Sequence, residues 1–232
     1  ARWALHEGEW LELLSGPPFD RIERAGRRVE AGRARLLAPC VPSKIVGVGL
    51  NYRAHAAELG LSLPQQPLLF LKPPSALAGP DEAIRLPPES GEVHHEAELA
   101  VVIGRRCRRV SVEEARSCVL GFAAINDVTA RDLQRADVQY TRAKGFDTFA
   151  PLGPWVETVL DPADLALGCR VDGRERQRGR TSDMVFGVWE LVAWASRGMT
   201  LLPGDVLATG TPPGVGPLSA GQTVEVEVEG LG

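Results

Sequence analysis

The chain has 232 residues, of which 44% are hydrophobic and 24% charged, and its formal net charge is -4. This length allows a full hydrophobic core, and the slight acidity argues against nucleic acid or anionic lipid as a partner. Four scattered cysteines without C-x-x-C spacing indicate neither a disulfide framework nor a zinc site. We expect a cytoplasmic protein, because the sequence shows no signal peptide and no apolar run of the ~20 residues that a membrane span needs.

The N-terminal part differs in character from the rest of the chain. Apolar residues flank a turn at positions 6–9, which predicts a hairpin over residues 2–14. The arginine-rich segment 21–35 has weak periodicity and is interpreted as a connection. We therefore expect a small N-terminal module over residues 1–40, a hairpin plus linker, and a main domain over residues 41–232.

Short strands dominate the predicted elements of the main domain. The expected strands cover residues 44–50, 68–71, 96–103, 119–126, 206–209 and 223–228. The expected helical segments are 52–59 with Asn51 as N-cap, one that starts at a capping box of Ser111 and Glu114, a turn at 129–134, and an amphipathic helix over 182–197. The Gly- and Pro-rich stretch 73–91 is predicted to be loop. Strands outnumber helices without a βαβ rhythm, which predicts a β-rich α+β fold on a mixed or antiparallel sheet.

Three acidic residues are candidates for a metal site. Glu96 and Glu98 lie two residues apart at the start of an apolar run, so on a strand they point to the same face. Such neighbours repel unless a cation joins them, and Asp127 ends a second apolar run where an unpaired carboxylate would be costly. Three carboxylates suit Mg²⁺ or Mn²⁺ better than Zn²⁺ and leave positions open for substrate. The alternative is a solvent-facing edge strand with alternating charges.

The four histidines differ in what their positions suggest. His55 and Glu58 share one face of the predicted helix, and such a pair can deprotonate a water while the carboxylate fixes the imidazole tautomer. The alternative is an ordinary surface histidine beside a glutamate. Strand alternation puts His94 on the face of Glu96, as a candidate to support the ligands, and points His95 into the packing. His6 lies in the predicted hairpin turn and is expected to be inert.

Several sequence blocks in order resemble the fumarylacetoacetate hydrolase superfamily, in its short branch of acylpyruvases and homoprotocatechuate-pathway isomerase/decarboxylases. The resemblance covers residues 44–231. The blocks are GLNYRAH (49–55), FLKP (70–73), HHEAE (94–98), NDVTARD (126–132), RAKGFD (142–147), PLGP (151–154) and TGTP (209–212). The resemblance implies a β-rich sandwich or roll with a few flanking helices, a homodimer, and a metal held by Glu96, Glu98 and Asp127.

The resemblance also implies roles for further residues. Lys144, one of only three lysines, matches the lysine that neutralises the substrate's oxyanion or carboxylate. Thr211 matches a position that hydrogen-bonds the substrate carboxylate, and Gln134 and Lys72 match further substrate-binding positions. His55 and Glu58 match a catalytic pair on a mobile lid. Arg131 and Asp132 are either a structural ion pair or substrate contacts.

The activity implied by the resemblance is metal-dependent chemistry on a small 2-oxo acid. In the family the metal chelates the 2-oxo-acid end and stabilises negative charge that develops at C3, a step shared by hydrolysis, decarboxylation and isomerisation. The leading expectation is a 2-oxo or 2-hydroxy-dienoic dicarboxylate as substrate, as for 2-hydroxyhepta-2,4-diene-1,7-dioate isomerase and 5-carboxymethyl-2-oxo-hex-3-ene-1,7-dioate decarboxylase. The alternatives are an acylpyruvate hydrolase with oxaloacetate decarboxylase activity, and a non-catalytic binding protein of the same fold.

Overall fold

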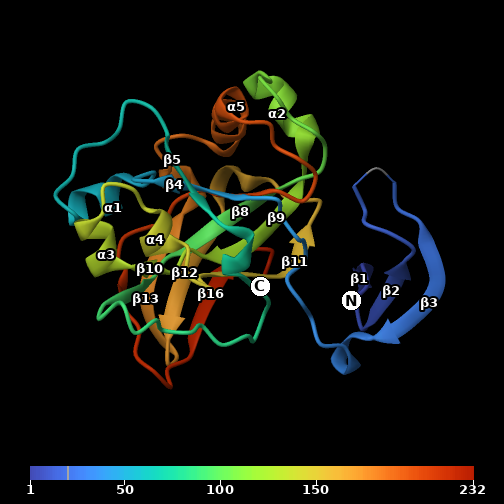
Figure 1. The fold of residues 1–232 in the computed structure, drawn as a ribbon. Coiled ribbons are helices and arrows are strands. Elements are labelled where there is room, and N and C mark those ends of the chain that lie inside the picture. The colour runs from blue at the N-terminus through green and yellow to red at the C-terminus, as the bar shows by residue number, and fades with distance from the viewer. Residues whose placement is uncertain (20) are drawn as a thin grey trace.

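The computed structural model describes residues 1–19 and 21–232. A seven-stranded mixed sheet forms the centre of the main domain, and a small three-stranded sheet stands beside it (Figure 1). The central sheet has the order β5 (Leu68–Lys72), β4 (Ile45–Gly49), β14 (Val206–Ala208), β8 (Ala97–Ile103), β9 (Val119–Asn126), β11 (Ala150–Glu157) and β6 (Leu77–Ala78). The expected β-rich α+β class is confirmed.

Two smaller sheets complete the main domain. One has the order β13 (Arg174–Arg180), β12 (Ala166–Val171) and β16 (Val224–Val228), and the other has the order β10 (Thr129–Ala130), β7 (Val93–His95) and β15 (Gly216–Pro217). Strands β12 and β16 contact β8 of the central sheet. The two glutamates of β16, Glu225 and Glu227, are exposed.

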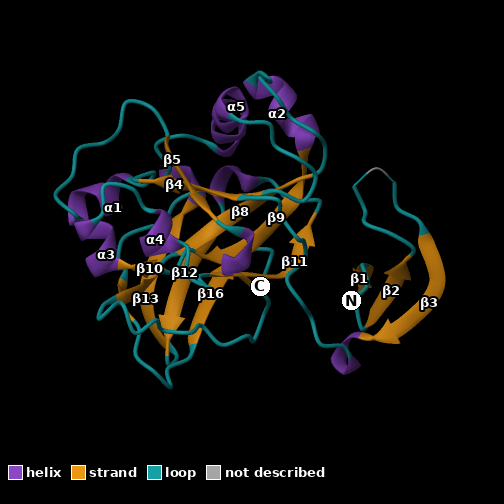
Figure 2. Ribbon diagram, viewed as in Figure 1, coloured by secondary structure: helices purple, strands orange, loops and turns teal. Residues whose placement is uncertain are grey.

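The helices lie around the strands rather than between them (Figure 2). They are α1 (Arg53–Glu58), α2 (Val112–Cys118), α3 (Arg131–Ala136), α4 (Thr141–Lys144) and α5 (Val188–Gly198). Helix α2 begins at the predicted capping box, in which Ser111 and Glu114 satisfy each other's backbone N–H groups. None of the helices in the described part of the chain is long and apolar enough to cross a membrane.

Strand β8 lies at the middle of the molecule and is buried on both faces. Leu99, Val101 and Ile103 belong to a core cluster that includes helix α5, whereas Ala100 and Val102 belong to a second cluster on the opposite face. Hydrogen-bonded neighbours on both sides, β14 and β9, complete its surroundings. The edge-strand alternative for residues 96–103 is therefore wrong.

The N-terminal module contains one more strand than expected. Strands β1 (Ala4–Glu7) and β2 (Trp10–Leu14) form the predicted hairpin. The segment 21–35, interpreted as a connection, contributes β3 (Arg24–Glu30), which pairs with β2. The ring of His6 stacks on Trp155 of β11 at 5.0 Å between centroids, so this histidine packs between the module and the main domain.

Asn51 joins three segments instead of capping a helix. Its side chain accepts a hydrogen bond from Phe186 N at 2.9 Å and donates to the carbonyls of Phe186 and Thr209 at 3.1 and 2.7 Å. The N-cap position of α1 is Tyr52. The same contacts explain why the helix predicted over 182–197 begins only at Val188: the backbone at Val185 and Phe186 bonds to Asn51 and stays outside the helix.

Replacing Asn51 with alanine should destabilise the protein strongly. The substitution removes the partner of one carbonyl at the buried Thr209 and of the N–H and carbonyl of the half-buried Phe186. A group left unpaired in a buried position costs about 1–3 kcal/mol. We expect the free energy of unfolding to fall by about 2–4 kcal/mol, measured by urea denaturation with an unchanged m-value. A loss below about 0.5 kcal/mol would show that water replaces these bonds.

Candidate active site

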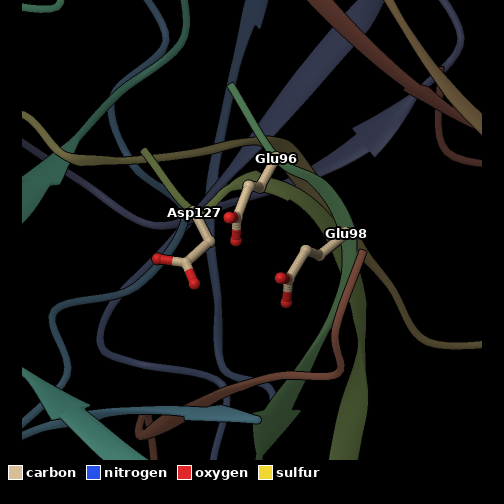
Figure 3. Close-up of side chains that lie close together, drawn as sticks. All are labelled: Glu96, Glu98 and Asp127. Carbon is tan, nitrogen blue, oxygen red and sulfur yellow. The ribbon is translucent and has the colours of Figure 1, made fainter. Parts of the chain in front are cut away.

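The three predicted carboxylates lie together in the structure. Glu98 projects from β8, Glu96 immediately precedes that strand, and Asp127 follows β9; the pairing of Ala97 with Asn126 brings these positions side by side. The carboxylates point toward a common space (Figure 3), and one ligand oxygen from each lies within 4.8 Å of the others. All three residues are buried.

Three cationic side chains surround the carboxylates. Lys144 Nζ donates to Glu96 at 2.7 Å and to Asp127 at 2.6 Å. Arg131 pairs with Glu96, and Lys72 pairs with Asp127. Glu98 has no such partner among the described residues and accepts only a backbone hydrogen bond, from Gly210 N at 2.7 Å.

The pKa shifts follow from these contacts. Burial raises the pKa of Glu98 well above its usual range, and the neighbouring charges of Asp127 and Glu96 raise it further. Burial acts in the same direction on Glu96, but the charges of Lys144 and Arg131 outweigh it and hold the pKa of Glu96 well below its usual range. For Lys144, burial is outweighed by Asp127 and Glu96, so its pKa is raised and its ammonium form is favoured.

This arrangement fits a hard divalent cation. The donor set is entirely oxygen, and Glu98 is a buried carboxylate that a cation would satisfy better than a proton. Glu96, Glu98 and Asp127 are the residues that could hold it. Lys144, which bridges two of these carboxylates, would then have to share them with the ion.

Lys72 lies behind Asp127 rather than beside the open pocket. Its side chain is completely buried, and its ammonium group bonds to Asp127 and to the carbonyl of Val128 at 3.1 Å. Burial lowers its pKa despite the attraction of Asp127. These contacts allow Lys72 to support Asp127, and its role in substrate binding stays a prediction.

Arg131 and Asp132 do not pair with each other. Besides Glu96, Arg131 contacts Gln134, donating from Nη1 to Oε1 at 2.6 Å. Asp132 instead accepts hydrogen bonds from Ser90 Oγ at 2.6 Å and Gly91 N at 2.9 Å. Of the two alternatives for these residues, the ion pair between them is wrong, and Arg131 belongs to the carboxylate cluster.

His55 and Glu58 form the expected pair on α1. His55 Nδ1 lies 3.0 Å from Glu58 Oε2, and the other carboxylate oxygen of Glu58 accepts a hydrogen bond from Gly214 N at 2.9 Å. The histidine is 5% exposed and lines the pocket that also contains Glu96 and Glu98. Because Nδ1 faces Glu58, Nε2 is the nitrogen left for a water or substrate.

Gln177 is a buried residue that the sequence analysis missed. Its side chain bonds to His95 Nδ1 at 2.9 Å, to Ala97 N at 3.0 Å and to Thr211 Oγ1 at 2.7 Å. Thr211 in turn donates to Ala97 O at 2.9 Å, which fixes its hydroxyl at the pocket wall. His95 thus points into the packing as expected, while His94 contacts Glu92 at 3.0 Å.

One pocket contains most of the predicted site residues. Its lining includes Glu96, Glu98, Arg131, Gln134, Lys144, Thr211 and His55. Glu58, Asp127 and Lys72 are not among the lining residues. Glu58 contacts the lining residue His55, Asp127 contacts the lining residue Lys144, and Lys72 contacts Asp127. The structure therefore brings together, around one space, nearly all the side chains that the sequence analysis selected.

The comparisons with known proteins agree with this geometry. The profile "Fumarylacetoacetate (FAA) hydrolase C-terminal" matches residues 44–232, and "Rv2993c-like, N-terminal" matches residues 1–39. The chain is 50% identical over 218 residues to Protein Rv2993c of Mycobacterium tuberculosis, with 93% of this chain and 82% of that protein covered.

Two solved structures are similar over nearly the whole chain. One is 5-carboxymethyl-2-hydroxymuconate delta-isomerase from Mycobacterium smegmatis, with 47% identity, a TM-score of 0.92, and coverage of 100% of this chain and 91% of that one. The other is 2-hydroxyhepta-2,4-diene-1,7-dioate isomerase from Mycobacterium marinum, with 47% identity, a TM-score of 0.90, and coverage of 96% and 84%. Fold, site and sequence together place this chain in the fumarylacetoacetate hydrolase family.

Proposed function

We propose that this chain is a divalent-metal-dependent enzyme that acts on the 2-oxo-acid end of a small substrate. The observation that carries the proposal is the buried cluster of Glu96, Glu98 and Asp127 at one pocket with Lys144 and Arg131. A bound Mg²⁺ or Mn²⁺ would supply Lewis-acid stabilisation of negative charge that develops at C3 of the substrate.

The protein's own groups have separable tasks in this proposal. Lys144 and Arg131 provide fixed positive charge beside the carboxylates, suited to a substrate carboxylate or a developing oxyanion. Thr211 offers its hydroxyl oxygen at the wall, held in place by Gln177 and the Ala97 carbonyl. His55 receives or returns a proton at Nε2, since Glu58 holds Nδ1.

Two reactions are candidates, each with its own support. Isomerisation of a 2-hydroxy-dienoic diacid is supported by the names of the two similar structures. Hydrolysis of a C–C bond in an acylpyruvate is supported by the His55–Glu58 pair, which is arranged to activate a water. Both reactions share the same charge development at C3, so the carboxylate cluster serves either one.

Replacing His55 with alanine separates the two reactions. If the histidine activates water, hydrolysis of acetylpyruvate should fall about 10²- to 10⁴-fold, the usual contribution of a general base, whereas ketonisation of a 2-hydroxy-dienoate should change little. Both rates are to be measured spectrophotometrically on the same preparation, with metal content checked.

Glu58→Gln is the matched variant, because it keeps the contact to Gly214 N possible while removing the charge behind the imidazole. It should reduce hydrolysis in the same direction but to a smaller extent. Equal losses in both reactions would contradict the water-activating role and would assign the pair to closure of the lid.

A further inference from the structure

The side chain of Gln177 is a buried amide with four hydrogen-bond partners. It is 1% exposed and belongs to β13, which is not part of the central sheet. Its Oε1 lies 2.9 Å from His95 Nδ1 and accepts a hydrogen bond from Ala97 N at 3.0 Å. Its Nε2 donates to Thr211 Oγ1 at 2.7 Å and to Pro212 O at 2.8 Å. These four bonds use both hydrogens and both lone pairs of the amide.

The two backbone partners fix which way round this amide lies. Ala97 N can only donate and Pro212 O can only accept, so Oε1 must face the first and Nε2 the second. A flipped amide would set donor against donor at one end and acceptor against acceptor at the other. Oε1 therefore also faces His95, whose Nδ1 must carry the hydrogen of the bond.

The four partners belong to two segments of the candidate metal site. Two lie in the ligand segment, residues 95–98, which carries two of the three carboxylates, and two lie in the adjoining turn, residues 209–212. The turn also supplies Gly210 N, which donates to Glu98 at 2.7 Å. Gln177 thus links the segment that bears the carboxylates to the turn that orients one of them.

Glu98 depends on this link more than the other two carboxylates do. Lys144 contacts both Glu96 and Asp127, and each of them has a second cationic partner. Glu98 accepts a hydrogen bond only from Gly210 N among the described residues. A shift of the turn relative to the ligand segment would therefore displace the one group that orients Glu98.

We propose that Gln177 is a positioning residue for the metal site. Its four bonds set the separation of the ligand segment and the turn, so that Glu96 and Glu98 can bind the same cation. Gln177 does not line the pocket and acts only through its partners. Residues that orient metal ligands in this way typically contribute about 10- to 100-fold to metal affinity. The inference rests on the proposed function, because it requires a cation at these carboxylates.

Metal affinity without substrate tests the inference directly. Gln177→Met keeps the approximate size of the side chain and removes all four bonds. Isothermal titration calorimetry with Mn²⁺ should show a Kd at least about tenfold higher than that of the natural protein. Ser196→Ala is the control, because it removes buried hydrogen bonds to Val110 N and Ala193 O away from the pocket, and it should bind Mn²⁺ normally. A smaller rise in Gln177→Met, or an equal rise in the control, would overturn the inference.

A second pair of variants keeps the test decisive if Gln177→Met does not fold. Thr211→Val keeps the shape of the side chain but breaks its bonds to Gln177 and to Ala97 O, whereas Thr211→Ser retains the hydroxyl. The Kd for Mn²⁺, again without substrate, should be about tenfold higher in the Val variant than in the Ser variant. Equal affinities of the two variants would overturn the inference.

The imidazole of His95 reports the orientation of the amide by nitrogen-15 NMR. At pH 8, above the ordinary histidine pKa of about 6.5, the ring should be neutral and carry its hydrogen on Nδ1. The signals can be assigned with His6→Gln, His55→Gln and His94→Gln, each of which removes one of the other histidines. A hydrogen on Nε2 of His95 in the natural protein would contradict the orientation of Gln177 and overturn the inference.

The calorimetry also distinguishes failure of the inference from failure of the proposed function. If the natural protein binds neither Mg²⁺ nor Mn²⁺, the metal site itself is wrong, and the inference falls with it. If the natural protein binds Mn²⁺ and Gln177→Met binds it equally well, only the inference is wrong.

Discussion

Glu98→Gln should remove metal binding and activity together. Glu98 is the one carboxylate of the cluster without a cationic partner among the described residues, so a bound ion would depend on it for charge as well as for an oxygen ligand. We expect kcat/KM to fall at least about a thousandfold, because Lewis-acid stabilisation is worth several kcal/mol and each ~1.4 kcal/mol is a factor of ten.

Metal binding can be measured through the Tm, without an activity assay. Mg²⁺ or Mn²⁺ should raise the Tm of the natural protein and leave that of Glu98→Gln unchanged. The variant should remain folded, because the amide keeps the volume and ends the repulsion from Glu96 and Asp127. Glu225→Gln, the same change on the exposed face of β16, is the control and should respond to metal normally. A Glu98→Gln protein that retains metal-dependent stabilisation would refute the proposed ligand set.

Lys144→Met should abolish most activity without weakening metal binding. The ammonium group bridges Glu96 and Asp127, so its removal leaves both carboxylates more available to a cation. It also removes the positive charge beside the substrate, and loss of such a contact typically lowers kcat/KM by about 10²- to 10³-fold. Arginine at this position should restore little, because its forked guanidinium does not replace a compact ammonium group between two carboxylates.

The prediction for Lys144→Met is that metal affinity and turnover do not fall together. Metal affinity measured by calorimetry should stay equal or rise in Lys144→Met while turnover falls. Lys44→Met is the control for removal of a lysine, since Lys44 pairs with Asp205 away from the pocket. Parallel loss of metal affinity and activity would indicate that Lys144 holds the cluster in shape rather than acting on substrate.

Local sequence signals predicted the parts of the fold that depend on few neighbours. The capping box of Ser111 and Glu114 is contained within four residues, and the strand over 119–126 is a single apolar run that became β9. The carboxylates were predictable because residues 96 and 98 must share a face, and because buried acidic groups need partners.

Long-range contacts account for what the sequence did not reveal. Asn51 has the side chain of a good N-cap, but its partners at Phe186 and Thr209 are more than 130 positions away along the chain. Gln177 lies in β13, whose sequence RERQRGR has no apolar pattern; pairing with β12 makes it a strand. The contact of Arg131 with Glu96 likewise depends on how α3 packs, so spacing alone left it ambiguous.

The residues that line the pocket come from two kinds of structure: Glu98 from a central strand, and Leu59 and Leu61 from a segment at the periphery. These two parts differ in how many substitutions they tolerate. Glu98 belongs to a strand held on both sides and buried on both faces, where few substitutions are compatible with folding. Leu59 and Leu61 belong to a partly exposed segment that tolerates change. Mutational libraries confined to residues 59–61 should therefore change the pocket lining while the carboxylate cluster stays as it is.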